Sequence, residues 1–335
     1  MSERVAILGA GSWGMAIARL LDSNGADVRL WEFDKAEHRK LIEHRTIPEK
    51  LKDACLAMSI DITNDLGYAV SDCDLVVLAV PSQMMRAAIQ PLGGILPKGT
   101  ALVSLAKGVE VSSLRRMSEV IQEGLAIPAE SVATLSGPSH AEEVVRDMPT
   151  TVVAASESHE LVDRLQTLFS SRTFRVYTSD DTVGVELGGA LKNIIAIGVG
   201  ITDGLGLGDN TRGALITRGL AEMSRLGVAM GARAETFAGL SGIGDLVTTC
   251  ISKHSRNRYV GEKIGQGVRL DEVLKSMAMV AEGVQTTRSG YQLRDKYKVE
   301  MPITTQVHQV LFEDKPAADA VAELMGRELK AEIWR

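Results

Sequence analysis

A glycine-rich turn close to the N-terminus constrains the fold of this chain more than any other feature. The apolar run Arg4–Leu8 predicts a short strand, and a G-x-G-x-x-G motif and a helical pattern follow it directly. A second predicted strand, Asp27–Trp31, ends in Glu32. In this order the motif indicates a dinucleotide-binding unit whose helix N-terminus receives the pyrophosphate, and the alternative is a purely structural turn. The predicted cofactor contacts in the motif are Gly9, Gly11 and Gly14.

Glu32 bears on the choice between the two nicotinamide dinucleotides. A carboxylate at the end of the second strand accepts hydrogen bonds from the ribose hydroxyls of NAD and repels the 2′-phosphate of NADP. The next residues are Phe33 and Asp34, so no arginine follows at once. Arg29 and Lys35 are close by, which keeps NADP open. The pattern favours NAD as the cofactor.

Apolar strand-like runs alternate with helical segments through the first half of the chain. This alternation implies an α/β fold with an open, doubly wound, mainly parallel sheet of the Rossmann type. Ligands lie beyond the carboxyl ends of such strands, so Val80–Ser82, Lys107 and Gly137–Ser139 are expected to line one cleft. The stretch Asp34–Ile60 predicts a helix followed by a loop. Further strands are predicted at Asp74–Val80, Ala101–Leu105, Val132–Leu135, Thr150–Ala154 and Phe174–Tyr177.

The pattern changes near Ser179, where strand-like runs give way to long helical periodicity. At ~150 residues per domain, a chain of 335 residues is expected to hold two domains. We therefore predict a dinucleotide-binding domain over residues 1–180 and an all-helical substrate and catalytic domain over residues 181–335.

One apolar helix, predicted over Asp181–Ile201, carries a single lysine near its middle. Gly184, Gly188 and Lys192 are spaced four apart and therefore share one helical face. Two interpretations stay open. Either a small polar molecule lies against the backbone under the ammonium group, or the helix is tightly packed in the core and its lysine reaches solvent.

Two later segments carry charges suited to a small anionic ligand. Asp245 follows the glycine-rich stretch Gly239–Gly244, at a bend where an acid could equally cap a helix. Ser255 and Arg256 open another predicted helix. A serine cap, free backbone N–H groups and a guanidinium together favour a phosphate, and a solvated basic patch is the alternative.

Composition argues against several classes of function. The net charge of −6 argues against binding to nucleic acids or anionic membranes. The cysteines and histidines show no metal-ligand spacing, so no metal is expected, and the odd number of cysteines fits a reducing cytoplasm. The N-terminus runs straight into a strand, so no signal peptide is expected. Polar residues within Val183–Ile201 argue against a membrane span there.

Seven motifs spread along the chain resemble those of one known family. They are GAGSWG, SLAKG, LSGPSHAEEV, GGALKNIIAIG, TRGLAEMSRLG, GIGDLVTTC and SRNR, in that order. Together they resemble the NAD(P)-dependent glycerol-3-phosphate dehydrogenases of the bacterial type over nearly the whole chain. The resemblance implies a homodimeric enzyme that interconverts sn-glycerol 3-phosphate and dihydroxyacetone phosphate by hydride transfer, and that supplies glycerol 3-phosphate for phospholipid synthesis.

The resemblance also implies roles for individual residues. Lys192 matches the family's general base, and Lys107 and Asp245 match substrate-contacting positions beside it. Phe33 falls on a cofactor-contacting position where members that use NADP tend to carry a basic residue, which again favours NAD. Asn193, next to the base, is a further candidate for a substrate hydrogen bond. The other implied cofactor contacts are Ser12, Trp13, Lys107, Ala141, Arg256, Val280 and Glu282, and the other implied substrate contacts are Gly137, Ser139, Ser255, Arg256 and Asn257.

Alcohol oxidation needs a lysine that can give up its own proton. At an ordinary pKa of ~10.4, a lysine is too well protonated to accept a proton from an alcohol. Burial and the charge of Lys107 are expected to lower the pKa of Lys192, and Asp245 is expected to oppose that change. Two other functions stay open: a related two-domain dehydrogenase for a hydroxy acid or keto acid, and a non-catalytic regulator that senses NAD.

Overall fold

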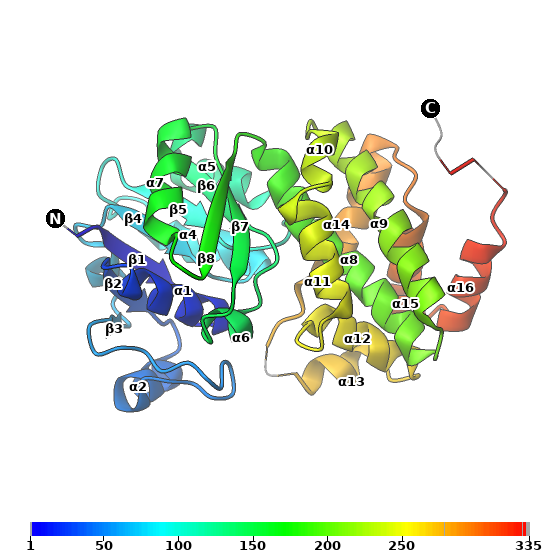
Figure 1. Cartoon of the computed structure of the whole chain (residues 1–335), viewed down its shortest axis with the longest axis horizontal. Coiled ribbons are helices and arrows are strands. Elements are labelled where there is room, and N and C mark those ends of the chain that lie inside the picture. The colour runs from blue at the N-terminus through cyan, green and yellow to red at the C-terminus, as the bar shows by residue number, and fades with distance from the viewer. Residues whose placement is uncertain (1, 278, 330, 333–335) are drawn as a thin grey trace.

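The chain up to Ser179 forms one eight-stranded sheet (Figure 1). The computed structural model describes residues 2–277, 279–329 and 331–332. The strand order is β3-β2-β1-β4-β5-β6-β7-β8, and all neighbouring strands are parallel except β6 and β7. The predicted Rossmann-type, mainly parallel sheet is therefore confirmed. The strands are β1 (Arg4–Leu8), β2 (Asp27–Trp31), β3 (Asp61–Thr63), β4 (Leu75–Leu78), β5 (Ala101–Ser104), β6 (Val132–Ser136), β7 (Thr150–Ala155) and β8 (Phe174–Ser179).

The strand β3 lies just beyond the stretch predicted as helix and loop, and the sequence pattern did not indicate it. It has three residues and only one buried side chain, and it pairs with β2 alone at the sheet edge. So short a strand has no apolar alternation to detect. It extends the sheet on the β2 side, so the crossovers from β1 run in both directions and a switch point lies between β1 and β4.

Helices cover both faces of the sheet, as a doubly wound fold requires. Val5 and Ile7 of β1 belong to a core shared with α1 and α7, whereas Ala6 and Leu8 belong to a second core shared with α4 and α5. Successive side chains of β1 thus fill opposite faces. The helices of this half are α1 (Ser12–Ser23), α2 (Lys35–His44), α3 (Leu66–Val70), α4 (Met85–Ile89), α5 (Met117–Leu125), α6 (Ala141–Val144) and α7 (His159–Phe169).

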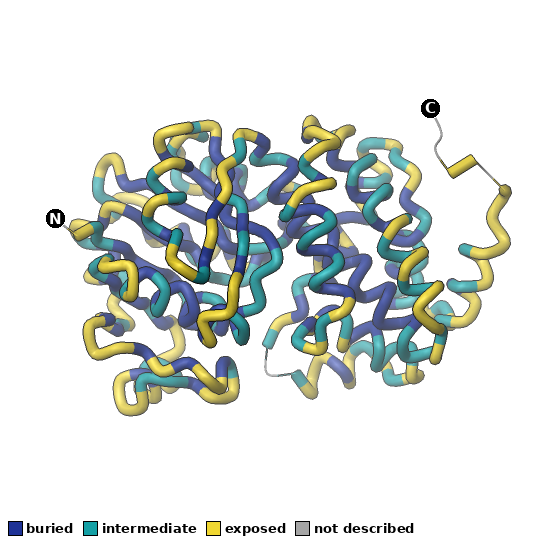
Figure 2. Tube along the Cα trace, viewed as in Figure 1, coloured by how far each residue is buried: buried dark blue, intermediate teal, exposed yellow. Residues whose placement is uncertain are grey.

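The helix α8 (Thr182–Gly204) is the centre of an all-helical second half, with every residue from Gly184 to Thr202 buried (Figure 2). It is the one helix of the described chain long and apolar enough to cross a membrane, but its apolar window is entirely buried, so it is a core helix here. The elements that pack against it are α9 (Asp209–Ala229), α10 (Ala234–Phe237), the π-helical turn η4 (Leu240–Gly244), α11 (Asp245–Ile251), α12 (Arg256–Gly265), α14 (Glu282–Tyr297) and α15 (Pro302–Phe312). Two further helices lie outside this layer: α13 (Leu270–Lys275) packs on α12, and α16 (Ala317–Met325) packs on α15.

A buried carboxylate ties α8 to the sheet half. Glu186 accepts hydrogen bonds from the Arg116 guanidinium at 2.6 Å, and from the backbone N–H and hydroxyl of Ser118 at 2.8 and 2.7 Å. Arg116 and Ser118 stand at the start of α5, and Glu186 is only 6% exposed. Because breaking a buried ion pair is costly, α8 is held in one register against the sheet.

Candidate active site

Two lysines from different halves of the chain meet one buried carboxylate. The Lys192 ammonium donates to Oδ1 of Asp245 and, at 2.6 Å, to the Thr249 hydroxyl. The Lys107 ammonium donates to Oδ2 of Asp245 at 2.7 Å and to the carbonyl oxygen of Gly137 at 2.8 Å. Lys192 is 5% and Asp245 1% exposed. The sequence-predicted residues Lys192, Lys107 and Asp245 therefore lie together, and Thr249 joins them.

Each member of this cluster is placed by the end or the middle of a secondary-structure element. Lys107 lies beyond the carboxyl end of β5, where ligands bind in open parallel sheets. Asp245 is the first residue of α11, directly after η4, and Thr249 is one turn further on. Asp181 fixes the start of α8, because its carboxylate accepts hydrogen bonds from the N–H groups of Gly184 and Arg233, both at 2.9 Å. The sheet end and the helical half thus converge on one point.

The electrostatics of the cluster suit proton exchange. Burial is the main cause that lowers the pKa of Lys192 to about 8, while Asp245 opposes this change and Lys107 adds to it. Burial alone would raise the pKa of Asp245, but the ammonium groups of Lys107 and Lys192 outweigh it and hold the pKa below its usual value. A lysine with a pKa near the working pH can both accept and donate a proton.

The glycine face of α8 does not hold a ligand, contrary to the first of our two interpretations of that helix. A methyl group added to Gly188 would collide with the backbone of Ser241, and one added to Gly184 would collide with Asp181 and Thr236. The glycines therefore leave room for the backbone of η4, which ends directly before Asp245. The second interpretation is half right, because the helix is tightly packed but its lysine is paired instead of reaching solvent.

Replacing Gly188 with alanine is expected to lower the free energy of unfolding by about 1–3 kcal/mol, because the methyl group overpacks a backbone contact that cannot move alone. Gly213→Ala is the matched control, since that helical glycine has no atom within 4 Å of the added methyl. It is expected to raise the free energy of unfolding by about 0.4–1 kcal/mol. Urea unfolding measures both, and equal effects would contradict the packing role of Gly188.

The side chains of Asn193 and Asn257 form hydrogen bonds with each other and with backbone groups of the chain. Nδ2 of Asn257 donates to Oδ1 of Asn193 at 2.9 Å, and the backbone N–H of Gly283 donates to Oδ1 of Asn257 at 2.9 Å. Nδ2 of Asn193 lies 3.3 Å from the carbonyl oxygen of Lys107. The two amides thus connect α8, α12, α14 and the loop after β5 beside Lys192, which makes positioning their visible role.

The phosphate candidates stand at the start of α12. The Ser255 hydroxyl caps the helix by accepting a hydrogen bond from the N–H of Arg258 at 3.2 Å. The Arg256 side chain is exposed, and its guanidinium donates to the carbonyl oxygen of Val280 at 3.0 Å. The His254 ring lies 6.0 Å from that of His140, and burial lowers the pKa of His140 to about 4, so His140 is neutral near pH 7.

The glycine-rich turn fits the pyrophosphate of a dinucleotide. Gly9 has φ +108°, a conformation that favours glycine, and a methyl group on Gly11 would meet no atom within 4 Å, so there is open space beside Gly11. No side chain caps α1, whose N-terminus can therefore meet an anion. The Ser12 hydroxyl lies 2.8 Å from the carbonyl oxygen of Lys50, and the Trp13 ring packs against Phe174 in the core.

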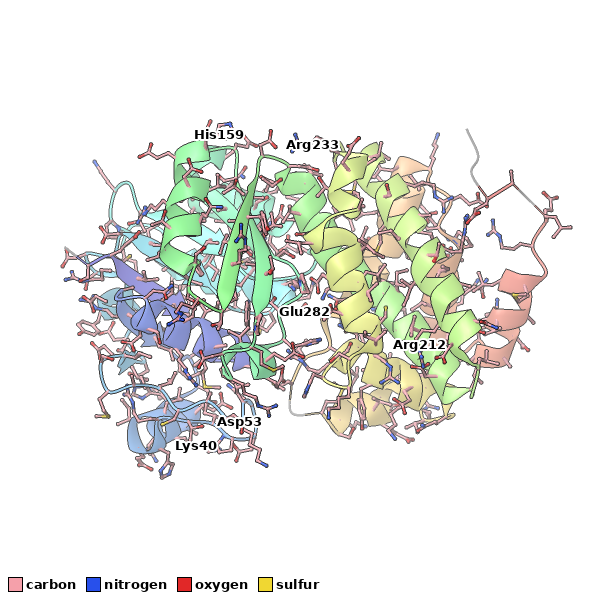
Figure 3. All side chains as sticks on the ribbon, viewed as in Figure 1. Lys40, Asp53, His159, Arg212, Arg233 and Glu282 are labelled. Carbon is pink, nitrogen blue, oxygen red and sulfur yellow. The ribbon has the colours of Figure 1, made fainter. Side chains whose placement is uncertain are left out.

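One of the remaining predicted residues, Glu282, makes a direct contact between the two halves. Both oxygens of Glu282 accept hydrogen bonds from Ser82, after β4, and burial raises the pKa of Glu282. The Ser139 hydroxyl donates to the carbonyl oxygen of Gly137 at 2.9 Å. Ala141 begins α6 and is buried, whereas Val280 is half exposed. Glu282 thus joins α14 to the sheet half, and it lies where the two halves meet (Figure 3).

The acidic end of β2 holds a lysine that the sequence did not indicate. Glu32 is buried, and its Oε1 accepts a hydrogen bond from the N–H of Asp34 at 2.8 Å. The Phe33 ring is 74% exposed. The Lys50 ammonium lies 3.7 Å from Oε2 of Glu32. Lys50 belongs to a stretch predicted only as loop, so no spacing could have found it, whereas the i,i+4 spacing of Asp245 and Thr249 could have indicated Thr249.

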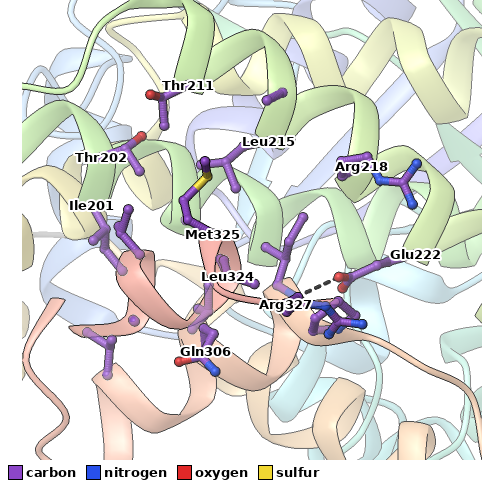
Figure 4. Close-up of a pocket in the computed structure, with 18 of the residues that line it drawn as sticks. Ile201, Thr202, Thr211, Leu215, Arg218, Glu222, Gln306, Leu324, Met325 and Arg327 are labelled. Atoms are coloured by element: carbon purple, nitrogen blue, oxygen red, sulfur yellow. Dashed lines mark hydrogen bonds between the residues drawn. The ribbon is translucent and has the colours of Figure 1, made fainter. Parts of the chain in front are cut away.

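A cavity of about 540 Å³ lies elsewhere, between α8, α9, α15 and α16 (Figure 4). Its wall is largely apolar and includes Leu215 and Met325. Glu222 also lines it and accepts hydrogen bonds from the N–H groups of Ile303 and Thr304, and burial raises the pKa of Glu222 to about 7. Among the residues that the structure describes, none of the predicted site residues lines this cavity.

Comparisons with known proteins agree along the whole chain. Residues 4–162 match the family model for the N-terminus of NAD-dependent glycerol-3-phosphate dehydrogenase, and residues 181–322 match the model for its C-terminus. The glycerol-3-phosphate dehydrogenase (NAD(P)+) of Geobacter sulfurreducens is 52% identical over 335 residues, which is 100% of both chains. That of Pelotomaculum thermopropionicum is 52% identical over 98% of this chain and 94% of its own. The crystal structure of glycerol-3-phosphate dehydrogenase from Coxiella burnetii is 38% identical, with a TM-score of 0.93 over 97% of this chain and 99% of its own.

Proposed function

This chain belongs to the family of NAD-dependent glycerol-3-phosphate dehydrogenases, and from that premise we propose how its own side chains perform the reaction. It is an oxidoreductase that interconverts sn-glycerol 3-phosphate and dihydroxyacetone phosphate with NAD(P). Family membership thereby decides against the hydroxy-acid dehydrogenase and the NAD-sensing regulator. The observation that carries the proposed mechanism is the buried contact of Lys192 with Asp245 and Thr249.

We propose that Lys192 is the proton acceptor in alcohol oxidation and the proton donor in ketone reduction. The bound nicotinamide supplies the hydride chemistry, and the residues of the chain supply position and charge. With its pKa lowered to about 8, Lys192 is partly neutral near neutral pH and can take the proton of the C2 hydroxyl. In the other direction its ammonium form stabilises the developing alkoxide and then donates the proton. Asp245 and Thr249 hold Nζ in place.

Lys107 supplies a second positive charge at the same point. Its ammonium shares the Asp245 carboxylate with Lys192, and its backbone carbonyl lies near the Asn193 amide. We propose that Lys107, Gly137 and Ser139 orient the substrate from the sheet side. Asn193 and Asn257 then act mainly by holding this wall against the helical half.

We propose that the start of α12 holds the substrate phosphate. The N–H groups of a helix N-terminus and an arginine side chain together suit a dianion. The Ser255 cap fixes the helix start, and the Arg256 side chain is exposed at the same place. Asn257, one residue further, connects this helix start to Asn193 beside the general base.

Arg256→Ala is expected to raise KM for dihydroxyacetone phosphate by an amount equivalent to about 2–4 kcal/mol, with a smaller change in kcat. The reason is the loss of a charged hydrogen bond to the substrate phosphate. A spectrophotometric assay of reduced-cofactor oxidation measures both constants. Arg269→Ala, which removes a 76% exposed arginine side chain elsewhere, is the control. Unchanged kinetics for Arg256→Ala would overturn the phosphate assignment.

Three further expectations stay proposals. We propose a domain boundary at residues 180/181, between β8 and α8, which the start of the matched C-terminal family model at residue 181 supports; the N-terminal model ends at residue 162. We propose a cytoplasmic location, which the free cysteines Cys55, Cys73 and Cys250 support. We also propose a homodimer, which analytical ultracentrifugation would test.

A further inference from the structure

We propose that Lys50 is a specificity-determining residue that contacts the 2′-phosphate when this chain binds NADP. The inference rests on the proposed dehydrogenase function and concerns the ribose end of the cofactor cleft. It revises the preference for NAD that Glu32 and Phe33 suggest from the sequence. The positive charge absent at residue 33 comes instead from a segment 17 residues further along the chain.

The position of the Lys50 ammonium is the first support. In a dinucleotide fold, the acid at the end of the second strand lies beside the ribose hydroxyls. Glu32 holds that place, and Nζ of Lys50 is 3.7 Å from its Oε2. Glu37, in the first turn of α2, makes a closer contact with the same ammonium. Lys50 is therefore centred between two carboxylates at the point where the two cofactors differ.

The backbone of Lys50 is fixed to the pyrophosphate turn. Its carbonyl oxygen accepts a hydrogen bond from the Ser12 hydroxyl at 2.8 Å, and Ser12 is the first residue of α1. Ile47 and Leu51, on either side, are 1% and 2% exposed in the core of the sheet half. The Lys50 side chain itself is only 18% exposed. The Lys50 backbone is therefore fixed beside the start of α1, and its side chain is largely buried there.

The charge balance explains how both cofactors can be accepted. Without Lys50, the carboxylates of Glu32 and Glu37 would repel a phosphate dianion. Lys50 neutralises one of these two negative charges, so it reduces the repulsion, and a 2′-phosphate could accept a hydrogen bond from its ammonium. With NAD bound, the Lys50 ammonium would keep its carboxylate partners, and the Glu32 carboxylate would accept hydrogen bonds from the ribose hydroxyls. The nearby Lys40 is paired more loosely, 4.0 Å from Glu49, and its side chain is 51% exposed, so it is a suitable control for a general loss of charge.

Two probes separate the phosphate from the rest of the cofactor. Isothermal titration measures the Kd of adenosine 2′,5′-bisphosphate and of adenosine 5′-monophosphate for the wild-type chain, Lys50→Met and Lys40→Met. We expect Lys50→Met to raise the Kd of the bisphosphate at least tenfold and that of the monophosphate less than threefold. Lys40→Met is expected to change both less than threefold. In the dehydrogenase assay, kcat/KM for NADPH should fall at least tenfold and that for NADH should stay within threefold.

The outcomes that would overturn the proposal are distinct. Equal losses for the two probes would make Lys50 a structural residue, and unchanged bisphosphate affinity would assign the 2′-phosphate elsewhere. Failure of the wild-type chain to use NADPH while using NADH would refute dual specificity but leave the dehydrogenase function intact. Failure with both cofactors would refute the function itself. Lys50→Arg keeps the charge and should keep the bisphosphate affinity within threefold, which guards against misfolding of Lys50→Met.

Discussion

Lys192→Met is expected to lower kcat for the reduction of dihydroxyacetone phosphate by about 10³-fold, within the range that general acid–base groups contribute. The thioether fills a volume close to that of the lysine stem but can neither hold nor transfer a proton. Asp245 keeps its hydrogen bond from Lys107 at 2.7 Å, so the variant does not leave a carboxylate without a partner. The fold and the cofactor cleft should therefore survive.

Fluorescence titration with NADH distinguishes loss of chemistry from loss of structure. The Kd of NADH for Lys192→Met should stay within threefold of the wild-type value while turnover collapses. Lys98→Met, which changes an exposed lysine beyond the cluster, is the control and should keep full activity. Retention of more than a tenth of wild-type kcat by Lys192→Met would refute the assignment of Lys192 as proton donor and acceptor.

Asp245→Asn is expected to have the second-largest effect, because it removes the carboxylate shared by two ammonium groups. Breaking a buried ion pair in this way should lower the free energy of unfolding by about 3–5 kcal/mol. Asp245 favours the charged form of Lys192, so its loss should move the pKa of Lys192 below about 8. Ketone reduction needs the protonated lysine, so its rate should begin to fall at a lower pH than in the wild type.

At pH 7 this variant should change the rates of the two reaction directions in opposite senses. Alcohol oxidation needs the neutral lysine, so its rising limb should also move to lower pH, and oxidation gains relative to reduction at pH 7. Profiles of kcat/KM against pH in both directions, with urea unfolding alongside, measure the shift. Asp271→Asn, at an exposed acid, is the control. A shift of either limb to higher pH would contradict the charge arrangement.

The sheet half was predictable because its signals are local. Apolar runs of four to six residues, each followed by a turn, are enough to indicate β1, β4 and β5. The strand β3 was not predicted, because it is short and pairs only at the edge of the sheet. The antiparallel pairing of β6 with β7 could not be predicted. The direction of a strand depends on how the connection before it packs, and no residue pattern within either strand encodes that direction.

The site was predictable in its charged residues but not in their supports. Lys192, Lys107 and Asp245 stand out because charges within apolar or glycine-rich segments are uncommon. The partner of the Gly188 face could not be predicted, since α8 is buried on every side and its sequence does not say which side meets η4. Lys50 gave no signal, because its importance comes from Glu32 and Ser12, which only the fold brings to it.

The carboxylate of Glu186 limits how the two halves of this sequence can diverge. It lies on the helix that carries Lys192, yet its partners Arg116 and Ser118 belong to the sheet half. A buried charge without its partner is destabilising, so a substitution on one side selects for a compensating change on the other. Recombination between distant relatives at residues 180/181 would separate these partners. We therefore expect the two halves to be exchangeable between relatives only together with Arg116, Ser118 and Glu186.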